Sequence, residues 1–469
     1  MMATPALTIR NLTSHTINIK HYEINDLHHT LNGGGRFSNF TSLWSTPANS
    51  KPPQSSLEDV SLLVEPFKSC KANVKPARVP HQSLSLFFEI DGELYQTNII
   101  HPTCHAQLLM PLTTNNRHNH TTVYHPEHHH LTIFYRGQQG SWMQSLRDET
   151  PLSALSIPGT HNSPTYHRAL PSVRCQVAPV REQLQQGVRF LDIRVQPEAP
   201  LDPSKDGLIL VHGVFPISLT GARHFWTVVN EVFEFLDQHP SETIIMSLKR
   251  EGLGNATDAQ LSRILRDHYA GDVNRWFTTP RIPTLAEARG KIVLIRRFAL
   301  EERLKNEWGG AGWCINGDAW ADNSPHSLCP SGDICFQDYY EVLETESIEK
   351  KVQYSIDHLK RAAQCVCLTS SEHKQPFYIN FLTASNFWKQ TCWPDRIAAK
   401  LNPAIVDYLC TKHNTPETIN SSEEGEQSVT GDGSTGIVVC DWVGREGNWD
   451  IVRCIIGMNA AFEAKEALH

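Results

Sequence analysis

Three short segments of the chain end in side chains that can move a proton or carry a fixed charge. They supply two histidines, His161 and His212, together with Arg194 and the carboxylate of Asp192. A base, an acid and a cation are the groups that phosphoryl transfer needs when no metal takes part. The segments are Ser156–Ser163, Arg189–Arg194 and Val211–Gly213.

The elements that must position these side chains begin near residue 150. From there, short apolar runs alternate with segments of helical periodicity, which favours an α/β fold. Strands are predicted at Leu208–His212, Thr243–Leu248, Lys291–Ile295, Phe377–Leu382 and Gly436–Asp441, and helices at 224–238, 257–269, 346–363 and 395–410. We interpret the pattern as a TIM-type (β/α)8 barrel, with distortion allowed, whose chemistry lies at the carboxyl ends of the strands. The candidate residues at such ends are His161, Arg194, His212, Lys249, Arg297, Asp338 and Asp441.

The first part of the chain has a different pattern of apolar and polar residues. A length of 469 residues exceeds one hydrophobic core, so two domains are expected, with a boundary near residue 140. Residues 1–140 contain alternating apolar and polar runs, which predict an antiparallel, sandwich-like β domain of unknown function. These runs are Leu7–Ile9, Ile17–Ile19, Ser83–Ile90 and Leu131–Tyr135.

Composition excludes several functions. The formal net charge of −8 gives no general attraction to nucleic acid. No apolar run of about 18 residues and no signal-like start is found, so the expected location is cytoplasmic or peripheral to a membrane. The 12 cysteines are expected to be reduced thiols, because they are scattered through a chain without a signal-like start. Neither Cys314, Cys329 and Cys335 nor Cys365 and Cys367 have good zinc spacing. We expect no metal and no cofactor, and the oligomeric state stays open.

Two polar stretches are interpreted as solvated loops. Residues 414–436 hold five acidic residues with many Ser, Thr and Gly, and are expected to form a mobile loop before the last strand. The histidines of the second stretch are irregularly spaced, which favours a solvated loop over a metal site. They are His118, His120, His125, His128, His129 and His130.

Residues 141–469 also contain a long ordered series of motifs. It includes Trp142-Met143, Pro151–Ser153, Ser156–Ser163, Gly187–Arg194, His212-Gly213, His239–Glu251, Gly290–Leu294 with Arg297, Trp320–Asn323, Gln337–Tyr340, Phe377–Phe381 and Val438–Asp441. This series resembles the metal-independent, bacterial-type phosphatidylinositol-specific phospholipase C family. The two-part layout is similar to fungal phospholipase C-like proteins, and residues 1–140 have no counterpart in the bacterial enzymes.

The resemblance implies cleavage of phosphatidylinositol, or a glycosylated derivative, to diacylglycerol and cyclic inositol phosphate at a peripheral membrane surface. It assigns His161 as general base with Asp441 orienting its ring, and His212 as general acid. Arg194 neutralises the phosphate, because a guanidinium keeps its charge and binds oxygens in pairs. Asp192 fixes Arg194 or a histidine.

The resemblance also implies a set of residues for the sugar hydroxyls. These substrate-binding candidates are Lys249, Glu251, Arg297, Asp338 and Tyr340, with Trp320 bordering them. In the calcium-dependent relatives a carboxylate replaces Arg194 and holds the cation, so no calcium requirement is expected here. Asn162 departs from the bacterial pattern, which has Asp there to support the protonated acid histidine. Since an amide carries no charge, His212 is expected to be a weaker proton donor near neutral pH.

Two alternative functions remain open. The departure at Asn162 and the β-rich appendage favour a catalytically weak, inositol-lipid-binding pseudoenzyme. A related barrel lyase acting on another lipid phosphodiester, such as a sphingolipid, is the third hypothesis. Such sites generally use magnesium held by carboxylates, and Arg194 argues against it.

Overall fold

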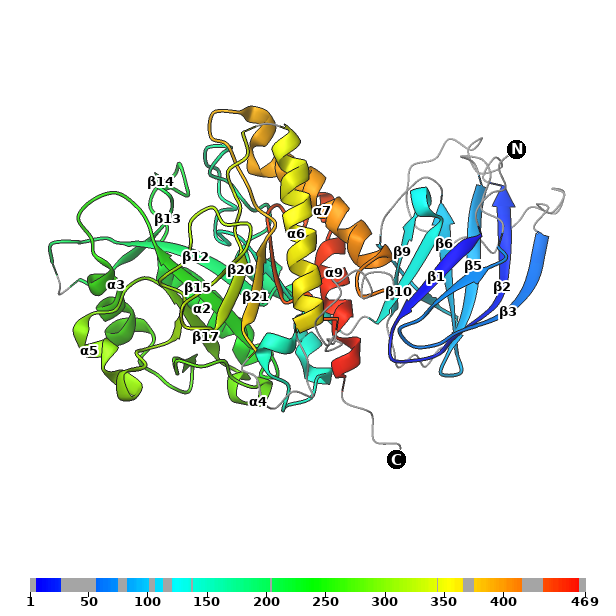
Figure 1. The fold of residues 1–469 in the computed structure, drawn as a ribbon, viewed down its shortest axis with the longest axis horizontal. Coiled ribbons are helices and arrows are strands. Elements are labelled where there is room, and N and C mark those ends of the chain that lie inside the picture. The colour runs from blue at the N-terminus through cyan, green and yellow to red at the C-terminus, as the bar shows by residue number, and fades with distance from the viewer. Residues whose placement is uncertain are drawn as a thin grey trace, which may run out of the picture. The chain divides into compact units, whose positions relative to one another are not determined.

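The computed structural model describes residues 6–26, 56–74, 82–100, 106–112, 120–135, 138–202, 205–343, 345–365, 375–415 and 433–463. The chain divides into two compact units, residues 1–136 and 137–469 (Figure 1). Most of the expected loop at 414–436 lies outside the described residues. Each unit is considered by itself.

The first unit consists of two five-stranded sheets. The strands of the first sheet follow in the order β4 (Ser69–Ala72), β1 (Leu7–Leu12), β10 (His130–Tyr135), β9 (His120–His125) and β7 (Ala106–Leu108). The strands of the second sheet follow in the order β3 (Ser56–Val64), β2 (Ile17–Asp26), β5 (Gln82–Ile90), β6 (Glu93–Ile100) and β8 (Met110–Pro111). All pairs are antiparallel except β1 with β10, which run parallel. The expectation of a purely antiparallel arrangement is therefore wrong at this pair, because strand direction follows a long connection that local alternation does not encode.

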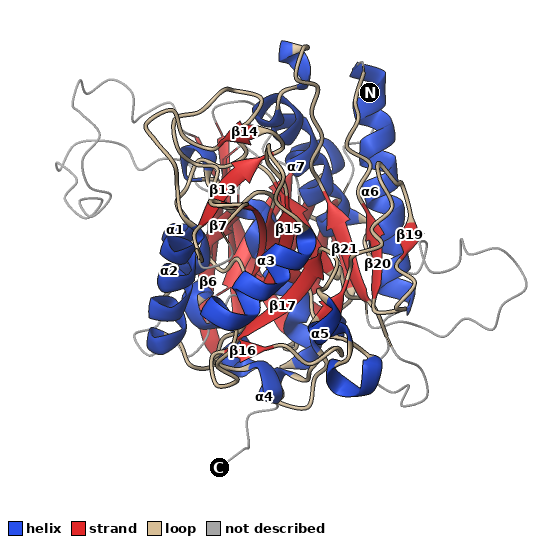
Figure 2. Cartoon of the chain, turned by 90° about the vertical axis from the view of Figure 1, so that its left-hand side faces the viewer, coloured by secondary structure: helices blue, strands red, loops and turns tan. Residues whose placement is uncertain are grey.

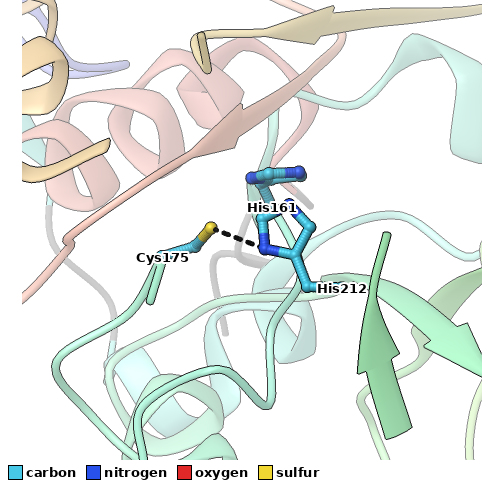
Figure 3. A group of neighbouring side chains, drawn as sticks. All are labelled: His161, Cys175 and His212. Atoms are coloured by element: carbon cyan, nitrogen blue, oxygen red, sulfur yellow. Dashed lines mark hydrogen bonds between the residues drawn. The ribbon is translucent and has the colours of Figure 1, made fainter. Parts of the chain in front are cut away.

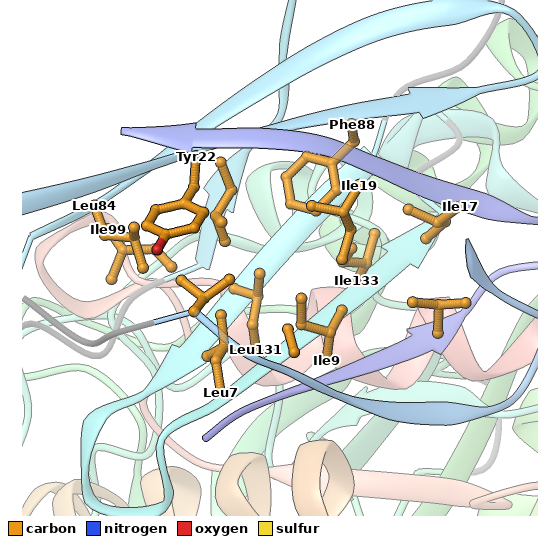
Figure 4. Packing of buried hydrophobic residues seen from close by; sticks show 14 of the residues in the cluster. Leu7, Ile9, Ile17, Ile19, Tyr22, Leu84, Phe88, Ile99, Leu131 and Ile133 are labelled. Atoms are coloured by element: carbon orange, nitrogen blue, oxygen red, sulfur yellow. The ribbon is translucent and has the colours of Figure 1, made fainter. Parts of the chain in front are cut away.

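One apolar core fills the space between these sheets. Figure 4 shows Ile9 and Ile133 from one sheet opposite Ile19 and Phe88 from the other, and all four side chains are fully buried. The alternation of apolar residues along each strand produces this inner face. The expected solvated histidine loop is wrong, since its described histidines lie in β9, in β10 and in the turn between them. His120, His125, His129 and His130 are buried.

The second unit is built on a curled, mainly parallel sheet of 12 strands. Its strands are rich in Ile, Val and Leu, and β17 is buried along its whole length, as expected for a parallel strand covered on both faces. The ladder runs β16 (Trp276–Phe277), β17 (Ile292–Arg297), β15 (Ile244–Arg250), β12 (Phe190–Pro197), β11 (Ile157–Thr160), β22 (Ile437–Cys440), β21 (Phe377–Phe381), β20 (Ile334–Gln337), β19 (Ser327–Leu328).

The predicted barrel is present as an open, curled sheet. A further short strand, β18 (Ile315–Asn316), pairs in parallel with β17. No ladder in the described part of the chain joins β18 to β20, so the path does not close there. All the remaining neighbours from β16 to β20 pair in parallel. Their carboxyl ends therefore meet at one edge, where the candidate residues are expected.

The placement of His212 differs from the prediction. Its strand β13 (Leu208–His212) pairs antiparallel with β12 and with β14 (Phe215–Pro216). β13 therefore forms antiparallel hairpins with β12 and β14 outside the parallel ladder, and it is not a barrel strand. A five-residue apolar run predicts a strand but not its partner or direction, which is why the sequence misplaced it.

Helices cover the outer faces of the sheet. In Figure 2, α2 and α6 lie along opposite sides of the strands. The inner face of α2 is an apolar stripe of three- and four-residue spacing that includes Val228, Val232 and Phe235. The α-helices are α1 (Val180–Gln185), α2 (Phe225–Gln238), α3 (Asp258–Ile264), α4 (Leu285–Ala288), α5 (Glu302–Lys305), α6 (Thr345–Cys365), α7 (Pro394–Thr411) and α9 (Asp450–Gly457). Among the described residues, none of the helices has the length and apolarity needed to span a membrane.

Candidate active site

His161 follows β11 and is held by the neighbouring strand β22. Its backbone N–H donates to the carbonyl of Cys440 at 3.0 Å, and its ring Nδ1 lies 2.9 Å from Oδ1 of Asp441, the residue after β22. A ring N–H at Nδ1 that donates to this carboxylate leaves the Nε2 lone pair available as a base. Burial is the main cause that lowers the pKa of His161 well below its usual value, and the charge of Arg194 acts in the same direction. The ring is therefore neutral near pH 7.

His212 approaches His161 from the β13 hairpin. The two ring centroids are 5.5 Å apart and the planes are nearly perpendicular (Figure 3). Nδ1 of His212 donates to the carbonyl of Val173 at 2.8 Å, which fixes the tautomer, because a carbonyl can only accept. Nε2 is then the atom that exchanges a proton. Burial, followed by the charge of Arg194, lowers the pKa of His212, while the Val173 carbonyl acts in the opposite direction.

Arg194 lies between two carboxylates. Nε donates to Oδ2 of Asp192 at 3.1 Å, and Nη1 donates to Oε1 of Glu251 at 2.7 Å. Burial acts to lower the pKa of Arg194, but the two negative charges outweigh it and raise that pKa. Burial acts to raise the pKa of Glu251, yet Arg194 and Lys249 bring it down to about 2. Arg194 and Glu251 are therefore both charged at neutral pH.

Asp192 connects this guanidinium with His161. Its Oδ2 lies 3.1 Å from Arg194 Nε and 3.9 Å from Nε2 of His161. The two residues Asp192 and Arg194 are two positions apart on β12, so their side chains leave the strand on the same face. Burial opposes ionisation of Asp192, but Arg194, Arg297 and the backbone N–H of Asn162 lower its pKa overall. One buried carboxylate thus lies beside both the ring of His161 and the guanidinium of Arg194.

Asn162 adopts a left-handed backbone conformation with φ of 43°. Its backbone N–H donates to Oδ2 of Asp192 at 3.1 Å, and this bond fixes the turn after β11. The side chain is buried, and within the described residues its Nδ2 has no hydrogen-bond partner. Asparagine is among the few residues that tolerate this conformation. The structure therefore gives the backbone of Asn162 a role that its side chain does not share.

Arg297, at the end of β17, is the centre of a second cluster of side chains. Nη2 lies 3.4 Å from Oδ2 of Asp338, and the guanidinium carbon lies 3.9 Å from the ring centroid of Trp320. The indole N–H of Trp320 donates to the same Asp338 oxygen at 3.0 Å. Within the described residues, Nε and Nη1 of Arg297 make no hydrogen bond although they are buried. Buried donors of this kind are costly unless a ligand satisfies them.

Lys249 and Tyr340 each contact a carboxylate. Nζ of Lys249 lies 3.0 Å from Oε1 of Glu251, with the side chain 38% exposed. The hydroxyl of Tyr340 donates to Asp322 at 2.8 Å, and its backbone N–H donates to Asn323. The structure thus joins Lys249 to the Arg194 network. Tyr340 is instead bonded to Asp322 and Asn323, and its carbonyl accepts from the backbone N–H of Ser385 at 3.1 Å.

The two histidines and Cys175 have donor atoms within 4.8 Å of one another, a spacing that could hold a metal ion (Figure 3). Sγ of Cys175 lies 3.7 Å from Nδ1 of His212. Burial raises the pKa of this thiol well above its usual value, so it is protonated at neutral pH. The Nδ1 atoms of both rings are also bonded, to Asp441 and Val173. The cluster suits proton transfer better than metal binding.

Sequence reasoning missed the loop that supports both histidines. The amide of Gln176 donates to the carbonyls of His161 and Cys440 at 2.8 and 2.9 Å, and Val173 and Cys175 contact His212. Phe381, in β21, lies beside both His161 and Arg297. The loop residues belong to no periodic segment and Val173 acts through its backbone, so no local signal marked them.

Comparison with known proteins identifies part of this unit. Residues 149–298 match the family model "Phosphatidylinositol-specific phospholipase C, X domain". This segment contains His161, Asp192, Arg194 and His212, whereas Asp338 and Asp441 lie beyond it.

Two curated relatives and one solved structure show similarity to this chain. A 1-phosphatidylinositol phosphodiesterase of Listeria monocytogenes is 36% identical over 172 residues, which cover 33% of this chain and 47% of the relative, about half its length. One from Staphylococcus aureus is 26% identical over 334 residues, which cover 68% of this chain and 94% of the relative. The structure, "Modulation of S.aureus Phosphatidylinositol-Specific Phospholipase C Membrane Binding", has a TM-score of 0.52 and 25% identity, and covers 68% of this chain and 97% of its own.

Proposed function

We propose that this chain, whose residues 149–298 belong to the phosphatidylinositol-specific phospholipase C X-domain family, is a phosphodiesterase that cleaves phosphatidylinositol or a glycosylated derivative. The products are diacylglycerol and cyclic inositol phosphate. The observation that carries the proposal is the pair of histidine rings 5.5 Å apart, both within the field of Arg194. Phosphatidylinositol phosphodiesterase is also the activity named for both curated relatives.

In the proposed first event, Nε2 of His161 removes the proton of the inositol 2-hydroxyl. The oxygen then attacks phosphorus and forms the cyclic ester. Asp441 holds Nδ1 at 2.9 Å, so the ring keeps the tautomer with a free lone pair on Nε2. Because the pKa of His161 is lowered, the base is in its active neutral form at neutral pH.

The departing glycerol oxygen receives its proton from Nε2 of His212. The Val173 carbonyl holds the opposite nitrogen, which keeps the donating atom pointed away from the loop. Arg194 faces the non-bridging phosphate oxygens, where its fixed charge replaces a metal ion, so calcium is not required. Loss of one such preorganised charge typically costs about 3–4 kcal/mol of barrier.

The inositol ring is proposed to lie between the Arg194 and Arg297 groups. Its vicinal hydroxyls are matched to Nε and Nη1 of Arg297, which make no hydrogen bond within the described residues, and to the carboxylate of Asp338. Lys249 and Glu251 contribute from β15, and Tyr340 closes the outer side. A sugar hydroxyl that reaches these buried groups removes the penalty of leaving them unpaired.

The lipid part is proposed to meet a group of exposed apolar side chains beside the hairpin of His212. Phe215, in β14, stacks on Phe387 at 5.3 Å, and Trp388 next to it is 91% exposed. Val214 and Leu343 are exposed too, and we name these five residues the aromatic rim. Exposed tryptophan favours the interfacial layer of a bilayer. A peripheral membrane location, with no nucleic-acid partner, follows from this proposal.

Asn162 favours a second candidate function, a catalytically weak inositol-lipid-binding protein. Among the described residues, His212 makes hydrogen bonds to Val173 and Cys175 but none to a carboxylate that would support its protonated form. With a lowered pKa, this histidine is mostly deprotonated at pH 7 and donates a proton in only a fraction of molecules.

Turnover of radiolabelled phosphatidylinositol vesicles in the presence of a chelator separates the two candidates. The enzyme proposal expects cyclic inositol phosphate from the wild-type chain and none from His161→Ala. Turnover only with calcium, or none in the wild type, would refute it. Vesicle binding by both proteins with no turnover in either would support the second candidate.

A further inference from the structure

A second group of potential metal ligands lies on the outer face of the sheet, away from the proposed active site. Donor atoms of His326, Cys335 and His358 all lie within 4.8 Å of one another. Cys335 and Gln337 are two positions apart on β20 and share a face, and Gln337 bonds Ser355 of α6. His358 also lies in α6, so the group sits between the strand and this helix.

His358 is the unusual member of the group. It is fully buried, and within the described residues neither ring nitrogen makes a hydrogen bond of normal geometry. A buried polar ring without partners is costly, which calls for a ligand that satisfies it. Its surroundings offer weak compensation, namely the backbone of Cys335 and the face of Tyr378 at 5.7 Å between ring centroids.

From this arrangement we propose a metal site formed by His326, Cys335 and His358 for a borderline-soft divalent cation of the zinc class. A tetrahedral zinc ion with bonds of about 2.0 Å to nitrogen and 2.3 Å to sulfur places these atoms roughly 3.5 Å apart. Sγ of Cys335 lies 3.8 Å from Nδ1 of His326, close to that requirement. Three protein ligands leave the fourth position to water.

The ionisation of the ligands also suits a metal. His358 is fully buried, and burial disfavours the charged imidazolium. A neutral imidazole is the form that binds metal. Cys335 supplies the soft ligand: its thiol loses a proton to the solvent as the metal–sulfur bond forms, so one proton is released per ion. His326 is exposed, which provides an entry path from solvent.

The three ligands come from a loop, a strand and a helix. His326 precedes β19, the last strand of the open ladder, and Cys335 lies on β20 beside it. A bound ion would tie this end of the sheet, where β19 is the edge strand of the ladder, to α6. Metal binding that requires the folded site stabilises the folded state. The inference is independent of the proposed reaction.

Cobalt titration of the tag-free, chelator-treated full chain tests the site. Cobalt bound to a thiolate gives a charge-transfer absorption that histidine sites lack, so histidines elsewhere do not interfere. We expect this band to saturate at one equivalent, zinc to displace it, and zinc to raise the melting temperature. His326→Ala changes an exposed side chain and should weaken binding by roughly tenfold or more, since even indirect changes to metal sites cost that much.

Matched variants make the result specific. Cys335→Ser should remove the band, whereas His268→Ala, which also removes an exposed histidine, should leave band and affinity unchanged. Cys175→Ser removes the other clustered cysteine and should leave the band unchanged. Absence of the band in the wild type would overturn the proposal. So would a band that persists in Cys335→Ser or disappears in Cys175→Ser.

Discussion

Nδ1 of His161 lies 2.9 Å from Oδ1 of Asp441, although 280 positions separate the two residues. The contact exists because β11 and β22 are parallel neighbours, with Thr160 paired to Cys440 immediately before them. Asp441, which follows β22, thereby orients the ring of His161, which follows β11. In the proposed mechanism this contact decides which nitrogen of His161 is the base.

Asp441→Asn should lower the turnover of phosphatidylinositol by about 100-fold or more, the usual contribution of a positioned base. An amide can present its N–H₂ group to Nδ1, which favours the tautomer with the proton on Nε2. Initial rates at saturating vesicles measure the effect, and circular dichroism checks the fold. A rate within threefold of the wild type would mean that this carboxylate does not orient the base.

The pH profile of kcat/KM should have its basic limb below pH 6.5. The reaction needs His212 protonated, and its pKa is lowered by burial and Arg194, so activity falls as pH rises through that lowered value. The acidic limb lies lower still, because His161 must be deprotonated and its pKa is lowered further. A basic limb above pH 7 would contradict the assignment of His212 as the acid.

Asn162→Asp should move that basic limb upward by about one pH unit and raise the rate at pH 7 about tenfold, since a nearby carboxylate favours the protonated imidazole. Aspartate also tolerates the left-handed backbone at this position. Asn306→Asp, at an exposed site, changes the net charge equally and should leave the profile in place. An identical profile in both variants would show that residue 162 does not act on the acid.

Much of this arrangement could be predicted from the sequence, because the strands that carry it are local apolar runs. Lys249, Arg297 and Asp441 were predicted at or just beyond the ends of strands, and parallel pairing brings such ends to one edge. Helices α2, α6 and α7 were predicted within two residues at each end. The periodicity of their apolar residues was sufficient.

The contacts that depend on chain topology could not be predicted. The antiparallel pairing of β13 and the Val173 carbonyl that holds His212 are both products of tertiary structure. The spacing of Cys335 from the neighbouring cysteines did not predict a zinc ligand, and the two histidines beside it are 9 and 23 positions away. Spacing rules detect metal sites within one motif, not across a strand, a loop and a helix.

Arg194→Lys should reduce turnover by roughly 100-fold, because lysine keeps a charge but cannot pair with two carboxylates and a phosphate in a plane. Added calcium should not restore the rate, since neither neighbouring carboxylate is released. Arg303→Lys, at an exposed position, is the control. Restoration of the rate by calcium would indicate a metal-dependent mechanism.

Trp388→Ala should weaken binding to phosphatidylinositol vesicles about tenfold, the effect of losing one large apolar contact. Hydrolysis of a soluble inositol phosphodiester should stay unchanged, because the side chain is 91% exposed and lies in the aromatic rim. Trp308→Ala removes another exposed tryptophan, 58% exposed, from a different part of the unit. Equal loss of vesicle binding in both variants would show that the aromatic rim has no special role in membrane binding.

Lys351→Met should stabilise the protein below pH 7. This lysine is fully buried in α6, and burial lowers its pKa to about 7. Below that pH the wild type holds a buried charge, and its stability rises between pH 7 and 10.5 because the unfolded chain then binds the extra proton. The variant should be more stable by about 1–4 kcal/mol at pH 6, with the gap closing toward pH 10. Denaturant titrations measure the free energy of unfolding of both proteins. A difference between them that stays constant from pH 6 to pH 10 would contradict this prediction.

The central claim is that His161 and His212 act as base and acid on opposite sides of one phosphorus atom. A phosphodiester of inositol with a nitrophenol leaving group tests it, because nitrophenolate departs without a proton donor. His212→Ala should lose activity on the natural lipid but keep most of it on the activated substrate, whereas His161→Ala should lose both. Equal losses for the two variants on both substrates would contradict the division of roles.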